Sequence, residues 1–551
     1  MATQTMKSQG RRPVDSRHGA LNEPIHPTGR IAFLLVLLAG LAYAGTSIVI
    51  DTGHVGEPLA IGAFLFLGLA LLIALGFEFV NGFHDTANAV ATVIYTNSLK
   101  PVTAVVWSGC WNFIGVLTSS GAVAYSIVTL LPVDLILQIG SAGGYAMIFA
   151  LLLAAVTWNL GTWYFGLPNS SSHALIGSIL GVGLANQLLA SGGASGTSGV
   201  DWSQATKVLT TLLVSPLVGF IGAFVLLRVM KVLIRDKQLY REPAQGKAPP
   251  LGIRALLVGT CTAVSFAHGS NDGQKGMGLI MLILIGVAPT AYALNRTMPD
   301  SSTPAFIQAS NDAQAIFRAK AAGATLAPAE ATSTLREALR TRKVDEPRVY
   351  AALGAASAQI NQDLRQYGAI SHVPAAATKN LRNEMYVVQD TLNLMTKDAK
   401  KAAAAYPGGG DKTLKAYESL LQKGTRFIPT WVKIAVALAL GLGTMVGWKR
   451  IVVTVGEKIG KTHLTYGMGA AAEVMAASTI LLADHLHMPV STTHILSSGV
   501  AGTMVADGAG LQGSTVRNIA MAWVTTLPAA MLIAGLLYWL FLTLVHAIGA
   551  A

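Results

Sequence analysis

The sequence predicts an all-α polytopic membrane protein in which two inverted-topology repeats contain broken helices and re-entrant hairpins. Three observations predict this fold: an apolar composition, a series of long apolar runs, and two polar phrases that each occur twice. Of the 551 residues, 52% are hydrophobic and 12% are charged, and the mean hydropathy is +0.51. These values are typical of helical membrane proteins rather than of soluble domains.

Apolar runs follow one another along most of the chain. Several reach the roughly 20 residues needed to cross the hydrocarbon, while others are shorter or are interrupted by glycine, so we expect about 10–12 membrane helical elements. The runs are 31–50, 58–80, 102–131, 146–166, 174–189, 207–233, 252–267, 276–294, 430–448, 468–483, 495–506 and 517–547.

Changes in composition divide the chain into seven parts. No cleaved signal is expected, because the first apolar run is as long as a transmembrane helix. The parts are a disordered tail (1–30), an extra membrane helix with its loop (31–57), a first membrane repeat (58–233), a basic cytoplasmic linker (234–253), the first part of a second repeat (254–294), a charged helical insertion outside the membrane (295–428) and the second part of that repeat (429–551).

Charge is distributed as in a membrane protein. The formal net charge is +12, but the basic residues cluster beside apolar runs, as they do in the linker 234–253, which is the positive-inside pattern of a cytoplasmic loop. We therefore expect a lipid bilayer as the partner of this chain and no nucleic acid. Residues 294–428 carry 18 Lys or Arg and 12 Asp or Glu, a density that excludes them from lipid. The sequence leaves open on which side of the membrane they lie.

The two polar phrases recur in the same order. The first runs from Gly82 to Asp85 and is echoed by Gly269 to Asp272; the second ends at His173 and is echoed by a phrase ending at His494. Asp85 precedes His173 by 88 residues and Asp272 precedes His494 by 222, and the difference, 222 − 88 = 134, matches the length of the insertion. This register indicates an internal duplication with a site at the repeat interface.

A carboxylate inside an apolar run is costly and therefore predicts function. The run that holds Asp85 is too long for one untilted span, so we expect the helix to break near Gly82 and Asp85 to hold a proton or a cation. Neutral oxygens would come from Asn81 and Asn88. The corresponding groups of the second copy are Asn271, Asp272, Gln274 and Lys275.

The hydroxyl-rich phrases predict an anion site. Pro168 and Pro489 suit the first turn of a helix, and the hydroxyls that follow them, together with free backbone N–H groups, would bind a tetrahedral oxyanion. Two further buried carboxylates, Glu78 and Glu473, are candidates for the same cavity, whereas Asp484 is expected at the membrane interface. We expect no cofactor and no resident metal site.

The four phrases resemble the signatures of the inorganic phosphate transporter (PiT) family. The resemblance rests on residues 79–89 and 268–276 and on the two hydroxyl phrases with the lead-in 161–168, and it covers nearly all of the membrane-embedded chain. It is nearest to the bacterial low-affinity, proton-coupled branch. It implies a multi-pass protein of the bacterial inner (plasma) membrane that imports inorganic phosphate or a neutral metal–phosphate complex without covalent chemistry. A homodimer is compatible with it.

Residue by residue, the resemblance implies one set of phosphate ligands and one set of coupling-ion ligands. The phosphate set is Ser170, Ser171, Ser172, Ser491, Thr492, Thr493, Asn88 and Gln274. For coupling ions, the resemblance implies Asp85 and Asp272. From their positions near these aspartates or in the same apolar runs, we add as coupling candidates Lys275, Asn81, Asn271, Glu78 and Glu473.

Two residues depart from the pattern of sodium-coupled relatives. His84 replaces the Asn that precedes the first aspartate, and Lys275 stands where the second motif would repeat Asn88. An ammonium beside Asp272 takes the role of a bound cation, so the departures favour coupling to protons over coupling to sodium. A sodium-coupled phosphate transporter or a sulfate permease of the same fold is the alternative, and an intramembrane aspartyl enzyme is the least favoured one.

Overall fold

The computed structural model describes residues 21, 26–55, 60–128, 130, 142–189, 200, 202–244 and 246–547, and it leaves the side chains of 86–88 and 203 undescribed. Within these residues nine helices are long and apolar enough to cross a membrane, or ten if a bent pair is one span. The predicted all-α membrane fold is therefore confirmed, and the ten candidate spans of the described residues reach the lower end of the expected 10–12 elements. The predicted disordered tail 1–30 lies almost wholly outside the described residues.

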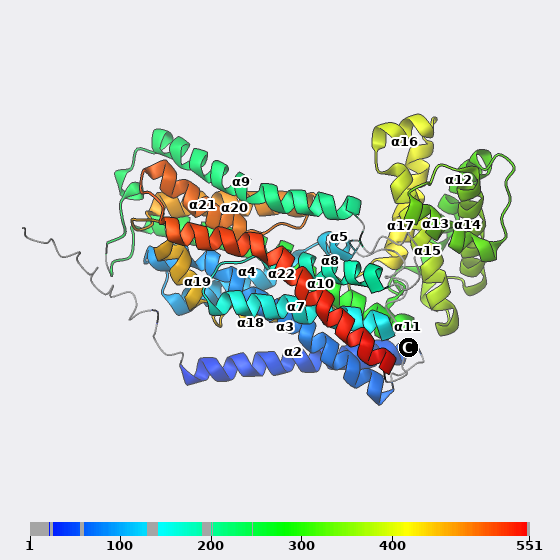
Figure 1. Cartoon of the computed structure of the whole chain (residues 1–551), viewed down its shortest axis with the longest axis horizontal. Coiled ribbons are helices and arrows are strands. Elements are labelled where there is room, and N and C mark those ends of the chain that lie inside the picture. The colour runs from blue at the N-terminus through cyan, green and yellow to red at the C-terminus, as the bar shows by residue number, and fades with distance from the viewer. Residues whose placement is uncertain are drawn as a thin grey trace, which may run out of the picture.

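The membrane helices run side by side along the long axis of the molecule (Figure 1). The first half of the chain forms α2 (Pro27–His54), α3 (Ile61–Tyr95), α4 (Pro101–Thr118), α5 (Ala122–Val128), α7 (Ala142–Tyr164), α8 (Ser171–Leu189) and α9 (Trp202–Leu233).

The second half of the membrane region follows a short 3-10 helix, η1 (Lys237–Tyr240). It consists of α10 (Leu251–Val287), α11 (Pro289–Tyr292), α18 (Thr430–Thr444), α19 (Lys449–Val453) continued by the π-helical turn η4 (Thr454–Lys458), α20 (Tyr466–His485), α21 (Thr492–Asp507) and α22 (Gly513–Ala547).

The helix break expected near Gly82 is wrong. Helix α3 continues through that position for 35 residues, and α10 continues through Gly269 for 37. The glycines serve close packing instead: a Cβ on Gly82 would overlap the carbonyl oxygen of Leu440 in α18. The equivalent contact joins α4 to α10, where a Cβ on Gly115 would overlap the carbonyl oxygen of Phe266. These two polar phrases therefore lie within continuous helices, and close backbone contacts pack α3 against α18 and α10 against α4.

Six helices between α11 and α18 pack on one another at one end of the molecule (Figure 1). Arg296 joins them to α11 of the membrane region: its guanidinium donates to Thr290 O at 3.0 Å and to Ser371 O and Thr378 Oγ1, both at 2.9 Å. The helices are α12 (Thr303–Lys320), α13 (Pro328–Thr341), α14 (Pro347–Tyr367), α15 (Ala375–Thr396), α16 (Ala399–Ala405) and α17 (Gly410–Thr425).

The continuity of α10 places the basic linker and the charged insertion at opposite ends of the membrane helices. The linker contacts the ends of α3 and α20: Asn97 donates to Ala244 O at 3.2 Å, and Tyr240 packs on Gly467. Helix α10 then crosses once and ends beside the insertion. If the linker is cytoplasmic, as the positive-inside rule predicts, the insertion lies on the outer side.

The glycine contact between α4 and α10 can be tested by substitution. Gly115→Leu is expected to lower the free energy of unfolding by about 1–3 kcal/mol or more, because the side chain would be forced into the backbone of α10. Gly259→Leu is the matched control, since a Cβ on Gly259 meets nothing within 4 Å. Thermal unfolding of the purified variants in detergent measures both effects, and equal melting temperatures for the two would contradict the packing described.

Orientation can be tested with single cysteines at two exposed positions, Ala324 in the insertion and Ala248 in the linker. Both variants would carry Ala in place of the native Cys110 and Cys261. A membrane-impermeant maleimide added to intact spheroplasts is expected to label Ala324→Cys and to leave Ala248→Cys unlabelled until the cells are lysed. The reverse pattern would show that the insertion is cytoplasmic.

Candidate functional site

The two hydroxyl phrases meet where the N-termini of α8 and α21 approach each other. The rings of His173 and His494 lie 4.6 Å apart. Ser170 and Ser491 accept hydrogen bonds of 3.2 Å from the backbone N–H groups of these two histidines, so both serines act as N-caps. The helices begin at Ser171 and Thr492, so the two prolines precede the caps rather than occupying the first turn as expected.

Asp85 of α3 holds both hydroxyl phrases at once. One carboxylate oxygen accepts from Ser171 Oγ at 2.7 Å, and the other accepts from Thr493 Oγ1 at 2.7 Å. His84 Nδ1 lies 3.1 Å from the second oxygen, and His84 Nε2 lies 3.2 Å from Thr162 Oγ1. Ionised groups form hydrogen bonds about twice as strong as neutral ones, and this carboxylate is buried. Asp85 is therefore the main link between the two phrases.

Lys275 of α10 makes the corresponding connection from the second repeat. Its ammonium forms an ion pair with Asp272 Oδ1 at 2.8 Å and donates to Ser172 Oγ and, at 3.3 Å, to Val490 O. Ser172 Oγ itself donates to the same carbonyl of Val490 at 2.9 Å. The side chains of Lys275 and Asp272 are both fully buried, so the ammonium is stabilised entirely by protein acceptors.

Other predicted site residues lie around this centre. Asn81 accepts from Ser171 Oγ at 2.8 Å, and Asn271 donates to Met488 O at 3.2 Å, just before the second phrase. Thr492 Oγ1 is buried and has no hydrogen-bond partner. The side chain of Asn88 lies outside the described residues. The structure thus brings most of the predicted phosphate and coupling residues into one buried cluster.

Three predicted residues lie away from the hydroxyl phrases. Gln274 accepts from Val123 N at 2.9 Å and donates to Asp484 Oδ1 at 2.6 Å, so its amide already has partners elsewhere. Glu78 packs against Gly276, and Glu473 accepts from Thr260 Oγ1 at 2.5 Å. Each of these two glutamates is fully buried and keeps one carboxylate oxygen without a hydrogen-bond partner.

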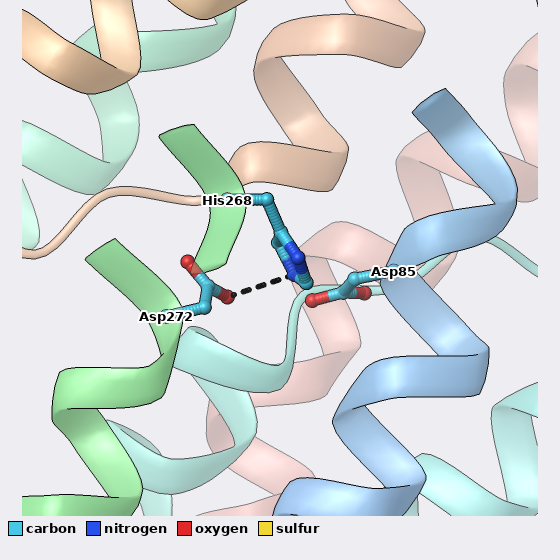
Figure 2. Close-up of side chains that lie close together, drawn as sticks. All are labelled: Asp85, His268 and Asp272. Atoms are coloured by element: carbon cyan, nitrogen blue, oxygen red, sulfur yellow. Dashed lines mark ion pairs between the residues drawn. The ribbon is translucent and has the colours of Figure 1, made fainter. Parts of the chain in front are cut away.

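The structure also brings together three groups that sequence spacing alone did not connect. Asp85 of α3 and His268 and Asp272 of α10 point toward one another, with the imidazole between the carboxylates (Figure 2). One ligand-type atom from each lies within 4.8 Å of the others, and all three side chains are buried. His268 stands four residues before Asp272, about one helical turn away. This spacing places the two side chains on one face of a helix, and it was the available sequence signal that they lie close together.

Sequence reasoning missed two further contacts. Asn112 of α4 accepts from His268 Nδ1 at 2.7 Å, a partnership that depends on the close α4–α10 packing and has no signal in local sequence. Asp484, expected at the membrane interface, accepts from Ser270 Oγ at 2.6 Å in addition to Gln274.

Comparison with known proteins identifies the family. The profile described as "Phosphate transporter family" matches residues 81–534. The chain is 44% identical over 506 residues to the low-affinity inorganic phosphate transporter PitA of Escherichia coli (strain K12), covering 87% of this chain and 98% of that protein. The chain belongs to the phosphate transporter family.

One further relative and one solved structure are similar to this chain. The low-affinity inorganic phosphate transporter of Buchnera aphidicola subsp. Acyrthosiphon pisum (strain APS) is 38% identical over 492 residues, covering 87% of this chain and 97% of that protein. A solved structure titled "The sodium-dependent phosphate transporter" aligns with 87% of this chain and 100% of its own, at 20% identity and a TM-score of 0.46.

Membership of the phosphate transporter family confirms the recognition made from the motifs. It also makes the chain a transport protein and sets aside the aspartyl enzyme, since the relatives are named as transporters.

Asp85→Asn is expected to reduce phosphate uptake roughly 10- to 100-fold, because hydrogen bonds to a charged acceptor contribute about 1.5–3 kcal/mol. Uptake of labelled phosphate into vesicles, normalised to the amount of inserted protein, measures the loss. Asp312→Asn, at an exposed position of α12, is the matched control and should transport normally. Wild-type uptake by Asp85→Asn would refute the role given to this carboxylate.

Proposed function

We propose that this chain imports inorganic phosphate across the bacterial inner (plasma) membrane with low affinity, as a secondary transporter coupled to protons. One observation supports the proposed coupling to protons: each buried aspartate has a basic side chain of the protein beside it. His84 lies 3.1 Å from Asp85, and Lys275 lies 2.8 Å from Asp272.

These two neighbours disfavour a sodium ion. Sodium bound at Asp272 would meet the Lys275 ammonium on the same carboxylate, and like charges in a medium of low dielectric constant repel strongly. At Asp85, the imidazole of His84 supplies an N–H donor where the pattern of sodium-coupled relatives has an amide that can offer an oxygen.

The hydroxyl phrases suit a tetrahedral oxyanion. Ser171 and Thr493 now donate to Asp85, and Lys275 donates to Ser172. A phosphate that still carries a proton would donate to the carboxylate and accept from the released hydroxyls. Sulfate has no proton to donate at neutral pH, so this exchange favours phosphate over sulfate. A protonated phosphate can make this exchange of hydrogen bonds either as the free anion or as part of a neutral metal–phosphate complex.

Glu78 and Glu473 are two further acidic side chains, and they lie on opposite sides of the central aspartates, toward the two membrane faces. Glu78 lies two helical turns from Asp85 on the side of the insertion, and Glu473 contacts Thr260, about three turns from Asp272 on the side of the linker. Both are buried with one unpartnered oxygen. We assign them to passing the coupling proton between the centre and either side.

The directions of the helices support alternating access between inverted repeats. Helix α21 runs from the centre to the linker end, where Asp507 pairs with Lys231. Helix α8 runs from the centre the other way and contacts the far half of α22, where Tyr538 donates to Asn186 at 2.8 Å. Two helices that begin at one site and run to opposite ends of the membrane region are the arrangement expected of such repeats.

Ion gradients imposed on proteoliposomes test the coupling. An inward proton gradient is expected to drive phosphate uptake by the wild type, and an inward sodium gradient at constant pH is expected to have no effect. Lys275→Asn should reduce proton-driven uptake at least about tenfold, since the ammonium connects Asp272 to Ser172; that factor corresponds to about 1.4 kcal/mol. Lys207→Asn, at an exposed position of α9, is the control.

Two outcomes would support the alternatives. Uptake by the wild type that follows sodium and ignores pH would identify a sodium-coupled transporter. Strong competition of labelled phosphate uptake by excess sulfate would identify a sulfate permease of the same fold.

A further inference from the structure

Arg382 of α15 is a buried arginine without an ion pair, at the junction between the insertion and the membrane helices. Its exposed fraction is 6%, and its Nε has no hydrogen-bond partner. Nη1 donates to the neutral side-chain amide oxygen of Asn383 at 3.3 Å, and the guanidinium lies 4.8 Å from the centre of the Tyr386 ring. Arginine is almost never fully buried unless it is paired. Burial also lowers the pKa of this guanidinium, so its charge is costly where it lies.

A second arginine lies beside the first. Arg426, between α17 and α18, forms an ion pair with Asp390 Oδ1 at 3.4 Å, and its guanidinium lies 5.5 Å from the centre of the Tyr125 ring in α5. The two guanidinium groups are near enough for Arg426 to disfavour the charge of Arg382. Like charges that are partly removed from water repel strongly. The two arginines therefore favour the approach of an anion.

The carboxylates of this region are held by other groups. Asp390 is the ion-pair partner of Arg426. Glu418, which also interacts electrostatically with Arg426, accepts from an amide and a hydroxyl of α15 at 3.1 and 3.0 Å. Within the part of the chain that the structure describes, neither carboxylate forms an ion pair with Arg382. A buried cation that lacks a carboxylate partner is strongly destabilising unless another acceptor compensates it.

The two arginines border α5, the short helix that packs on α10 beside the centre. Tyr125 OH donates to Phe427 O, next to Arg426, at 2.7 Å. Two residues earlier in α5, Val123 N donates to the side chain of Gln274 in α10 at 2.9 Å. Figure 1 shows α5 at the end of the membrane region that faces the insertion. Helix α5 therefore connects the arginines to the part of α10 that carries the central residues.

We propose that Arg382 and Arg426 form a second oxyanion site, which binds inorganic phosphate where the insertion meets α5 before the anion reaches the buried centre. The identity of the anion rests on the proposed phosphate transport, whereas the site rests on the unpaired guanidinium. With the linker in the cytoplasm, this junction faces the outer side, from which imported phosphate arrives.

The chemistry of the two side chains suits phosphate. A guanidinium presents a planar fork of N–H donors that matches two phosphate oxygens, and hydrogen bonds between charged groups are about twice as strong as neutral ones. A phosphate oxygen would accept from the unpartnered Nε of Arg382 and would supply the negative charge that this guanidinium lacks. The ion pair of Arg426 with Asp390 need not break, because a guanidinium has five N–H donors.

Uptake kinetics in membrane vesicles test the site. Arg382→Met keeps an unbranched side chain over Tyr386 and removes the charge. We expect it to raise the phosphate concentration that gives half-maximal uptake roughly 3- to 10-fold, because the anion loses charge-assisted hydrogen bonds. The maximal rate at saturating phosphate should stay unchanged. Arg382→Lys keeps the charge without the fork and should lie closer to the wild type.

Arg365→Met is the matched control. This arginine is exposed on α14 of the same insertion, so its loss should leave the half-saturating concentration unchanged. A half-saturating concentration for Arg382→Met equal to that of the wild type would overturn the inference. An equal change in Arg382→Met and Arg382→Lys, together with lower melting temperatures, would also overturn it, since Arg382 would then serve only packing over Tyr386.

Phosphate-dependent melting of the purified protein in detergent is a second measurement, and it needs no transport. It compares Asp85→Asn, in which the central site is weakened, with the double variant Asp85→Asn/Arg382→Met. A ligand that binds only the folded state raises the melting temperature. Inorganic phosphate is expected to raise that of the single variant more than that of the double variant, and an equal rise in both would reject the site. A rise with phosphatidylglycerol but not with inorganic phosphate would also reject it, by assigning Arg382 to a lipid headgroup.

Failure of this inference is distinguishable from failure of the proposed function. Absence of uptake by the wild type under every gradient would reject the proposed function, while the melting comparison would still decide whether the junction binds phosphate. Normal uptake with unchanged half-saturation in Arg382→Met would reject the junction site and leave phosphate transport standing. If Arg382→Met does not fold, Arg382→Lys carries both comparisons, with smaller expected changes.

Discussion

The buried carboxylate of Asp85 is the interaction on which the arrangement of the membrane core depends. It accepts hydrogen bonds from Ser171 at the start of α8 and from Thr493 at the start of α21. Each of these hydrogen bonds to a charged acceptor contributes about 1.5–3 kcal/mol, so a helix that leaves the centre loses that stabilisation unless another donor replaces its hydroxyl. A protonated anion is such a donor. Under the proposed function, a protonated phosphate would replace these hydroxyls as the donor to Asp85.

Close packing of continuous helices makes this network possible. Because Gly82 and Gly115 have no side chain, α3 lies directly against α18, and α4 lies directly against α10. The short distance between α4 and α10 places Asn112 within reach of His268, and it holds the imidazole between the two aspartates. Polar groups at membrane depth are thus satisfied by neighbouring helices, and no free backbone from a broken helix is required.

The membrane fold, the two repeats of polar phrases and most of the central cluster were predictable from the sequence, because buried charge in apolar runs has few explanations other than function. The continuity of α3 was not predictable, since a glycine beside an aspartate fits a break and a close contact equally well. The amide of Gln274 was assigned to phosphate, but Val123 N and Asp484 take its hydrogen bonds. Such partners come from tertiary packing, which local spacing does not reveal.

The two halves of the site carry matching aspartates but unequal cations. In the first repeat, the basic group is His84, directly before Asp85; in the second it is Lys275, three residues after Asp272. The His84 imidazole lies between Asp85 and Thr162, whereas the Lys275 nitrogen is held between Asp272 and Ser172. The basic neighbour of Asp272 therefore also donates to a hydroxyl phrase, and the basic neighbour of Asp85 does not. Asp85 accepts from both hydroxyl phrases directly, whereas Asp272 is connected to them through Lys275.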